Sequence, residues 1–192
     1  MDKTVFRSLA LLVLAAIAGC ASDGTPIERL DAGTGVTWRA AGRAAVFART
    51  DPRYSRSARD YLYLGPVETN TRGLREYYLW VGIASTLDRG FLAPERPLPV
   101  ALTLLIGGEP VDLDLQPWPG VVGTAARLAP YDPPVTPQLQ LGARITASLL
   151  ERIRAEGIDG LRARLADETA QPYFFWEPLP AWTGFFDGNG AR

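Results

Sequence analysis

Apolar and polar residues alternate with a period of two along several short stretches of the chain, which is typical of half-buried β-strands. Glycine, proline and other turn-forming residues separate these stretches, so consecutive strands are expected to run antiparallel. The predicted strands are residues 36–41, 44–49, 60–69, 74–86, 100–106, 111–116, 161–165 and 171–177. Gly65-Pro66 interrupts the pattern of 60–69 and is expected to stop that strand.

The stretch 74–86 is the longest candidate strand, and it is apolar on both faces. One face carries Tyr77, Leu79, Val81 and Ile83, and the other carries Tyr78, Trp80, Gly82 and Ala84. A strand of this kind needs cover on both sides, so we place it centrally in a sheet. Gly82 is a candidate for a bulge or bend.

The segment 138–156 fits two patterns. A four-residue recurrence of apolar side chains predicts one helix over 137–156, capped by Thr136. Alternation over residues 139–145 instead predicts a strand, with a helix after Thr146 and with Ser148 and Glu151 as a capping box. We favour the strand, because Gly142 would weaken a helix by about 1 kcal/mol relative to alanine. Both readings end the helix at Gly157.

Two segments show no sustained period. Residues 117–137 contain six prolines and form a long loop, which is either functional or packed down by Trp118 and Tyr131. Residues 178–192 are expected to form an irregular tail that packs through Trp182 and two phenylalanines. The predicted fold class is α+β: mainly an antiparallel β-sandwich with one helix near 147–156, in a single domain spanning 36–177.

The first twenty residues follow a different pattern. Lys3 and Arg7 precede an apolar run, residues 8–18, that is too short to span a bilayer and is typical of a signal peptide. The run ends in Ile17-Ala18-Gly19-Cys20, which resembles the lipobox of bacterial lipoproteins. The resemblance implies removal of residues 1–19, acylation of Cys20 by chains such as palmitate, and a tether over 20–35.

The same resemblance implies a location. In the lipoprotein pattern, an Asp directly after the cysteine retains the protein at the inner membrane, whereas Ala21 and Ser22 follow here. We therefore expect a lipid anchor in the periplasmic face of an outer membrane, with inner-membrane anchoring or surface exposure left open. Two or more acyl chains make such anchoring stable.

Composition restricts the chemistry. The chain has no histidine, no lysine after Lys3, and Cys20 as its single cysteine. These absences exclude Ser-His and Cys-His hydrolase arrangements, Schiff-base chemistry and imidazole metal sites. We predict a non-enzymatic protein with no catalytic residues, metal or cofactor. The formal net charge of −1 argues against nucleic-acid binding, which needs a basic surface.

Candidate binding residues come from two groups. Arg49, Arg53, Arg56 and Arg59 lie within eleven residues, and a short helix capped by Asp51 would place Arg53 and Arg56 on one face as an anion-binding surface. The alternative is a solvated loop. Among the five tryptophans, the two predicted loop residues, Trp118 and Trp182, are candidates for exposed aromatics, whereas the other three lie in strand patterns and are expected in the core: Trp38, Trp80 and Trp176.

These observations predict an envelope lipoprotein that presents a β-rich domain to an envelope protein partner, through an exposed sheet edge or the 117–137 loop. The alternative is binding of an anionic envelope glycan or lipid by the four arginines and the loop tryptophans. A hydrolase that uses only carboxylates is less favoured. Asp112 and Asp114 would be its catalytic pair, but they lie on the predicted solvent face of a hairpin.

Overall fold

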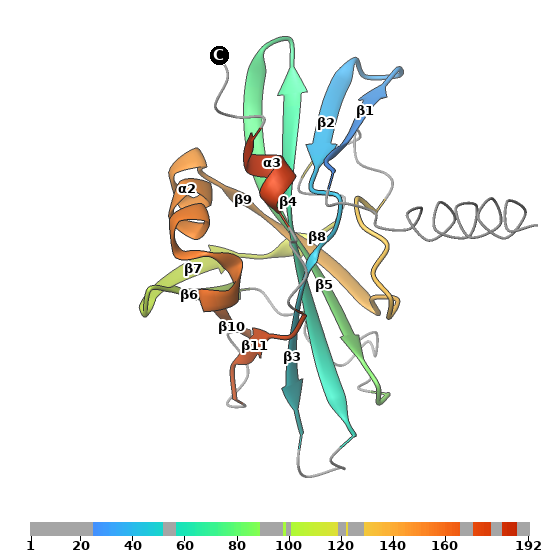
Figure 1. Cartoon of the computed structure of the whole chain (residues 1–192). Helices are drawn as coiled ribbons and strands as arrows, with labels where there is room; N and C mark the ends of the chain where they lie inside the picture. Colours follow the sequence, from blue (N-terminus) through green and yellow to red (C-terminus); the bar gives the residue numbers. More distant parts are fainter. Residues whose placement is uncertain are drawn as a thin grey trace, which may run out of the picture.

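The computed structural model describes residues 25–51, 57–88, 98, 101–118, 122, 129–165, 171–177 and 182–187. These residues form one sheet with eleven antiparallel strands and short helices (Figure 1). The strands are β1 (Ile27–Asp31), β2 (Val36–Ala40), β3 (Ala45–Thr50), β4 (Arg59–Thr71), β5 (Leu74–Ser85), β6 (Ala101–Ile106), β7 (Glu109–Asp114), β8 (Gln116–Pro117), β9 (Leu139–Ile145), β10 (Arg162–Leu165) and β11 (Tyr173–Phe175). The helices are α2 (Ala147–Glu156), the 3-10 helix η2 (Ile158–Gly160) and α3 (Thr183–Asp187).

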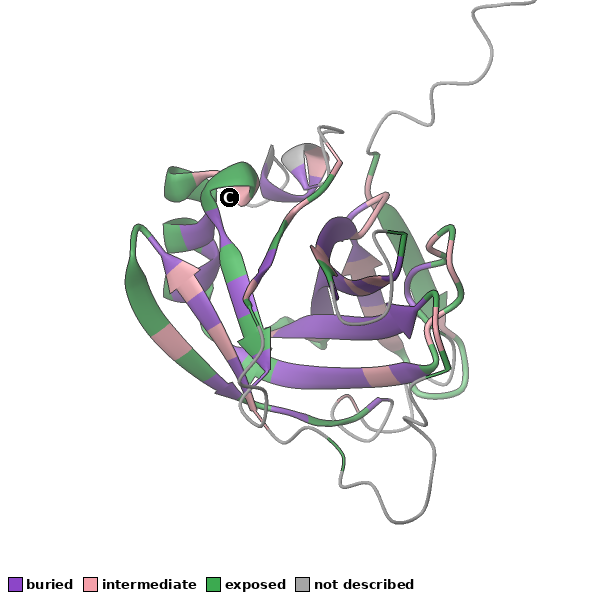
Figure 2. Ribbon diagram, turned by 90° about the horizontal axis from the view of Figure 1, so that it is seen from below, coloured by how far each residue is buried: buried purple, intermediate pink, exposed green. Residues whose placement is uncertain are grey.

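The sheet curls into a nearly closed barrel. Its strand order is β7-β6-β10-β11-β3-β4-β5-β9-β8, and only Leu115 separates β7 from β8 in the sequence. Because β7 pairs with β6 while β8 pairs with β9, the chain itself joins the two ends of the sheet. Seen from below, the strands surround a buried interior (Figure 2).

The predicted mainly antiparallel β-fold with little helix is confirmed, but the prediction of two packed sheets is wrong. Long, twisted strands such as β4 and β5 curl a single sheet until it nearly closes, which leaves few strand edges unpaired. The cover that β5 needs on both faces therefore comes from the barrel interior on one side and from a loop layer on the other.

The hairpin of β4 and β5 runs through the whole molecule (Figure 1). The prediction that Gly65-Pro66 stops the first strand is wrong, since β4 continues to Thr71. Pairing of β4 with β3 ends at Leu64, and pairing with β2 begins at Val67. Pro66 therefore lies in the gap between these two neighbours, where its missing N–H removes no ladder hydrogen bond on that side.

The interior of the barrel is filled by large apolar side chains. Cross-strand register places Leu62 opposite Ile83 and Leu64 opposite Val81, and all four are fully buried. Strands on the other side of the barrel contribute further buried residues on the same face, among them Leu102, Leu104, Ala163, Leu165 and Tyr173. The interior is thus a packed core rather than a channel.

The outer face of β5 carries a second aromatic layer. Trp80 lies between Gly65 on β4 and Gly142 on β9 in the cross-strand register, and its ring contacts that of Tyr131 with a centroid distance of 5.3 Å. A Cβ atom at Gly65 would overlap the Tyr131 ring, and one at Gly142 would lie 2.7 Å from the Trp118 ring. Small residues in these strands therefore make room for the rings.

Gly82 has the same role. It pairs regularly with Tyr63 and Gln140, so the predicted bulge is not formed, and a Cβ there would lie 2.5 Å from the Trp80 ring. The predicted packing of the 117–137 loop by Trp118 and Tyr131 is confirmed for its described residues, because both side chains are buried.

The strand reading of residues 139–145 is confirmed by β9, and the alternative single helix is wrong. Helix α2 begins after Thr146, whose hydroxyl accepts a hydrogen bond from the Leu149 N–H at 3.2 Å. The cap is therefore Thr146 rather than the Ser148 capping box. The helix ends at Gly157, which has a positive φ of 85°, as predicted.

Two predicted irregular segments contain regular structure. Strand β1 lies inside the predicted tether 20–35, and α3 lies inside the predicted tail 178–192. Elements of only five residues give a weak local signal. Here pairing with β2 stabilises β1, and burial of Trp182, Phe185 and Phe186 stabilises α3.

Substitution of Gly65 by Ala tests the outer aromatic layer. We expect Gly65→Ala to lower the free energy of unfolding by about 1–3 kcal/mol, since the Tyr131 ring must move off its site. The Tyr131 hydroxyl, which donates to Pro66 O and accepts from Ala41 N–H, would lose its alignment. Urea denaturation measures the effect. In a Tyr131→Ala background the same substitution should be nearly neutral, and an equal cost in both backgrounds would contradict this packing.

Alkaline pH tests the same layer. Burial raises the pKa of Tyr63 to about 12, against an opposing hydrogen bond from the Val135 backbone, and burial raises the pKa of Tyr131 well above its ordinary value. In the unfolded chain both tyrosines lose their protons near pH 10. Stability should therefore be complete below pH 10 and fall as the pH rises through about 12. Tyr63→Phe should make this fall shallower in urea denaturation between pH 9 and 12.

Candidate functional site

Three of the predicted site residues, Cys20, Arg53 and Arg56, lie outside the described residues, as does most of the predicted short helix after Asp51. Arg49 and Arg59 are described, and they lie on opposite faces of the sheet. Arg49 is opposite Asp60 on the interior face, whereas Arg59 is one residue earlier on β4 and points outward. The structure therefore does not combine these two arginines into one surface.

Arg49 belongs to a buried ion pair. Its Nε and Nη2 both donate to Asp60 Oδ2 at 3.2 Å, and the Ser85 hydroxyl donates to Asp60 Oδ1 at 2.7 Å. The guanidinium also lies over the ring of Tyr173, 4.3 Å from its centroid. Both oxygens of the buried carboxylate are thus bonded, and Arg49 is engaged inside the barrel rather than presented to a ligand.

Trp118 and Trp182 are not exposed, so this prediction is wrong. The Trp118 ring lies against Gly142, and Trp182 is fully buried, with its indole Nε1 donating to Leu64 O at 3.2 Å. The prediction took both residues to be exposed because it placed them in loops. Chain segments that cross the surface or the ends of a barrel are instead anchored by burying large side chains.

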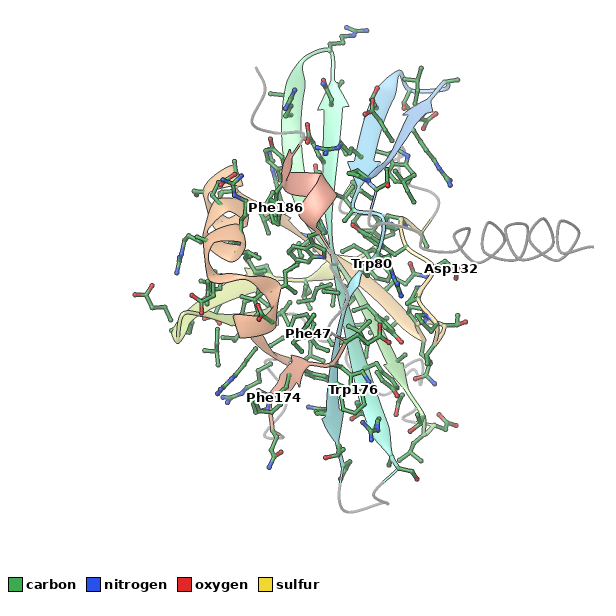
Figure 3. All side chains as sticks on the ribbon, in the orientation of Figure 1. Phe47, Trp80, Asp132, Phe174, Trp176 and Phe186 are labelled. Atoms are coloured by element: carbon green, nitrogen blue, oxygen red, sulfur yellow. The ribbon has the colours of Figure 1, made fainter. Side chains whose placement is uncertain are left out.

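The exposed aromatics lie instead on β11 and directly after it. Phe174 is 42% exposed and Trp176 is 48% exposed, which corrects the prediction that Trp176 belongs to the core. Figure 3 shows both side chains on the lower half of the molecule, near β11 and β3. The sequence signal was available: in Tyr173-Phe174-Phe175-Trp176 neighbouring side chains alternate in direction, so two of the four rings face outward.

Arginines lie over both exposed rings. The Arg162 guanidinium is 5.3 Å from the Phe174 ring centroid, and that of Arg59 is 4.0 Å from the Trp176 ring centroid. Arg162 is opposite Phe174 on the neighbouring strand, and the Trp176 N–H bonds to Val46 O on β3. We call these four side chains, Arg59, Arg162, Phe174 and Trp176, the β11 patch.

The β11 patch is positively charged. Within the described part of the chain, neither Arg59 nor Arg162 forms an ion pair, and Arg59 Nη1 is buried without a hydrogen-bond partner. Two carboxylates neighbour the patch in sequence, and each lies near another arginine: Asp60 pairs with Arg49, and Glu177 is 4.0 Å from Arg43. Stacking holds the guanidinium groups against the rings, and those of their N–H groups that reach the surface can bind an acceptor.

A pocket of about 360 Å³ borders the β11 patch at Val46. Its other lining residues include Arg43 from the β2–β3 connection and Tyr131, Asp132 and two prolines from the loop that covers Trp80. The pocket therefore combines one basic and one acidic side chain with an apolar floor, and it lies where the outer loop meets β3.

The two aspartates considered for carboxylate catalysis lie on one strand. Asp112 and Asp114 are both exposed on the outer face of β7, as expected, and the Thr103 hydroxyl donates to Asp112 at 2.6 Å. Within the described ranges, no group of three or more His, Cys, Asp or Glu side chains could hold a metal ion.

Comparison with models of protein families, with curated proteins and with solved structures finds no match to this chain. None of the helices in the described ranges combines the length and apolar character that crossing a bilayer requires.

Alanine substitutions of Arg49 and Arg59 distinguish a structural arginine from a surface arginine. We expect Arg49→Ala to lower the free energy of unfolding by about 3–5 kcal/mol, because it leaves the Asp60 carboxylate buried without its counter-charge. Arg59→Ala loses only a stacking contact on an exposed ring and should cost about 0.5–1 kcal/mol. Urea denaturation of both variants measures the difference, and equal costs would contradict these assignments.

Proposed function

We propose that this chain is an envelope lipoprotein, anchored by acylated Cys20, that holds a rigid β-barrel at the membrane surface and binds a protein partner through the β11 patch. The observation that carries the proposal is the pair of exposed rings, Phe174 and Trp176, each with an arginine over it. The proposed location is the periplasmic face of an outer membrane, and the proposed role is non-enzymatic.

The composition of the patch favours a protein partner. Aromatic residues and arginine are the residue types most enriched at the energetic centres of protein interfaces. Large exposed rings keep apolar surface in contact with water, and covering each ring contributes roughly 1.5–3 kcal/mol. Because the arginines already lie over the rings, binding orders few additional side chains and loses little conformational entropy.

The rigidity of the support also favours recognition. Phe174 and Trp176 flank Phe175, whose ring meets Phe47 edge-on at a centroid distance of 5.7 Å. Tyr173, on the other side of Phe174, is fully buried beside the Arg49–Asp60 pair. The exposed rings are therefore held by alternate residues that are anchored within the barrel.

The anionic-glycan alternative has fewer candidate binding residues at the surface than the sequence indicated. Arg49, Trp118 and Trp182 are buried, so three residues of the proposed glycan surface are not presented to a ligand. Arg59 and Trp176 remain, and a sugar ring stacks on an exposed indole. We therefore treat a glycan ligand as a competing outcome of the experiment below.

A photo-crosslinking residue at position 174 tests the protein-partner proposal in intact cells. We expect one major protein adduct, and we expect none from position 74, since Leu74 is 67% exposed but lies at the far end of the β4–β5 hairpin. With the partner purified, Trp176→Ala should weaken binding at least tenfold, as for a central interface residue. Leu74→Ala should leave binding unchanged.

The same variants separate the alternatives. Absence of a protein adduct at position 174, together with binding of an acidic polysaccharide that Trp176→Ala and Arg59→Ala both weaken, would replace the protein partner by a glycan. Equal binding of the partner by the parent chain and by Trp176→Ala would remove the β11 patch from the interface.

A further inference from the structure

Two β-hairpins project side by side from one end of the molecule (Figure 1). Residues 32–35 join β1 to β2, and residues 72–73 join β4 to β5. Because β2 pairs antiparallel with β4, the two turns lie at the same end of a four-stranded ribbon. Pairing of β5 with β9 ends at Tyr77, so this end of β5 extends past β9. We call residues 30–37 and 70–75 the hairpin end.

Two leucines at the hairpin end are exposed. Leu74 is 67% exposed and Leu30 is 66% exposed. Leu30 lies in one cross-strand row with Thr37 and Asn70, and Leu74, which is opposite Thr71, lies in the next row. Neighbouring rows face opposite sides of a sheet, so one leucine lies on each side of the ribbon. A flat partner surface would cover only one of them, whereas a fluid medium around the turns would cover both.

The only charged residue within the two turns is Arg72. The nearby carboxylates are engaged within the chain. Glu68 and Glu76 each pair with another arginine, and Asp31 Oδ1 accepts the Gly33 N–H at 2.9 Å. The Arg72 side chain is therefore an exposed positive charge at the extremity of the β4–β5 hairpin.

Arg72 also has an unfavourable backbone conformation. Its φ is 53°, and within the described ranges no other residue except glycine has a positive φ. The next residue, Gly73, has a φ of 92°, so both central residues of the turn are left-handed, as in a type I′ turn. Asparagine or glycine is favoured at the first of these positions, because a longer side chain crowds the backbone there. An arginine that weakens its own turn indicates a function for its charge.

We propose that the hairpin end docks on the lipid surface to which acylated Cys20 is attached, an inference that rests on the lipid anchor of the proposed function. Leu30 and Leu74 enter the boundary between the headgroups and the acyl chains, where apolar side chains are stabilised. Arg72 lies among the phosphates of anionic lipids, which attract basic side chains close to a membrane surface. Lipid surrounds the end of the ribbon and so covers the leucines on both of its sides.

The length of chain between Cys20 and β1 is compatible with this orientation. From Cys20 to Ile27 the chain spans at most about 25 Å when it is fully extended. Strand β1 rises about 14 Å from Ile27 toward the first turn. The extended chain is longer than this rise, so acylated Cys20 can lie at the level of the turns.

The docking also leaves the β11 patch accessible. Phe174 is opposite Ala48 on β3, which is opposite Tyr61 on β4. About 30 Å of β4 separates Tyr61 from the turn after Thr71. With the hairpin end on the membrane, the β11 patch therefore lies away from the lipid, where a partner can approach it.

Fluorophores at single introduced cysteines test the docking. Acylation leaves Cys20 without a thiol, so a new cysteine in the anchored chain is labelled alone. Leu74→Cys, Leu30→Cys and Phe174→Cys are labelled with nitrobenzoxadiazole and reconstituted into vesicles of three parts phosphatidylethanolamine to one part phosphatidylglycerol. A spin label on the lipid acyl chains should lower the emission at least twofold at positions 74 and 30. It should have little effect at position 174, the matched control, since Phe174 is also an exposed apolar residue.

Arg72→Asn separates membrane contact from turn stability. Asparagine is favoured at this position of the turn, so the variant should melt at a higher temperature than the parent chain. In the labelled Leu74→Cys chain, the same substitution should reduce the quenching at least by half, because the positive charge is lost. Replacing phosphatidylglycerol by neutral phosphatidylcholine should reduce the quenching of the parent similarly. An arginine that served only the turn would not produce this combination.

Equal quenching at positions 74 and 174 of an acylated chain would overturn the docking, and so would quenching at position 74 that neither Arg72→Asn nor neutral lipid reduces. Mass spectrometry of the purified chain reports acylation separately, and a chain without acyl groups would overturn the proposed anchor together with the docking. Crosslinking from position 174 in cells should be the same in Arg72→Asn and the parent. Failure of the docking is thus distinguishable from failure of the proposed function.

Discussion

The central hairpin of β4 and β5 is apolar on both faces, and the need to cover both faces governs the rest of the structure. On the inner face, Leu62, Leu64, Val81 and Ile83 pack against strands from the far side of the barrel. On the outer face, Trp80 and Tyr131 form a layer that fits because glycines lie beside them. Closure of the sheet provides the first cover, and the 129–137 segment provides the second.

The same constraint explains which polar groups are available for recognition. A closed barrel must satisfy any charge that its strands carry inward, and the Arg49–Asp60–Ser85 cluster does so with hydrogen bonds to both carboxylate oxygens. Charges on the outward positions of the neighbouring strands remain at the surface. Arg59 and Arg162 are such charges, and they lie over rings that the interior has no room to bury. Recognition therefore falls on the outer face of β11.

The sequence located a part of the candidate site and misassigned the rest. Arg59 was identified from the arginine-rich stretch, but Arg49 in the same stretch turned inward, because residues 49 and 59 occupy opposite sides of the paired strands. Trp176 was assigned to the core and Trp118 and Trp182 to the surface, and all three assignments were wrong. A strand pattern shows that side chains alternate, but it does not show which of the two faces is buried when both are apolar.

Local chemistry alone determined the positions of most strands, the start of α2 after Thr146, its end at Gly157 and the expectation of a lipid anchor at Cys20. These features depend on a few adjacent residues, so a single sequence carries them. The tertiary structure alone decided that the sheet closes into a barrel, that β4 continues through Pro66, and that residues 27–31 form a strand paired with β2. Each of these depends on which distant segment supplies a hydrogen-bonded neighbour, and alternation with a period of two contains no information about that partner.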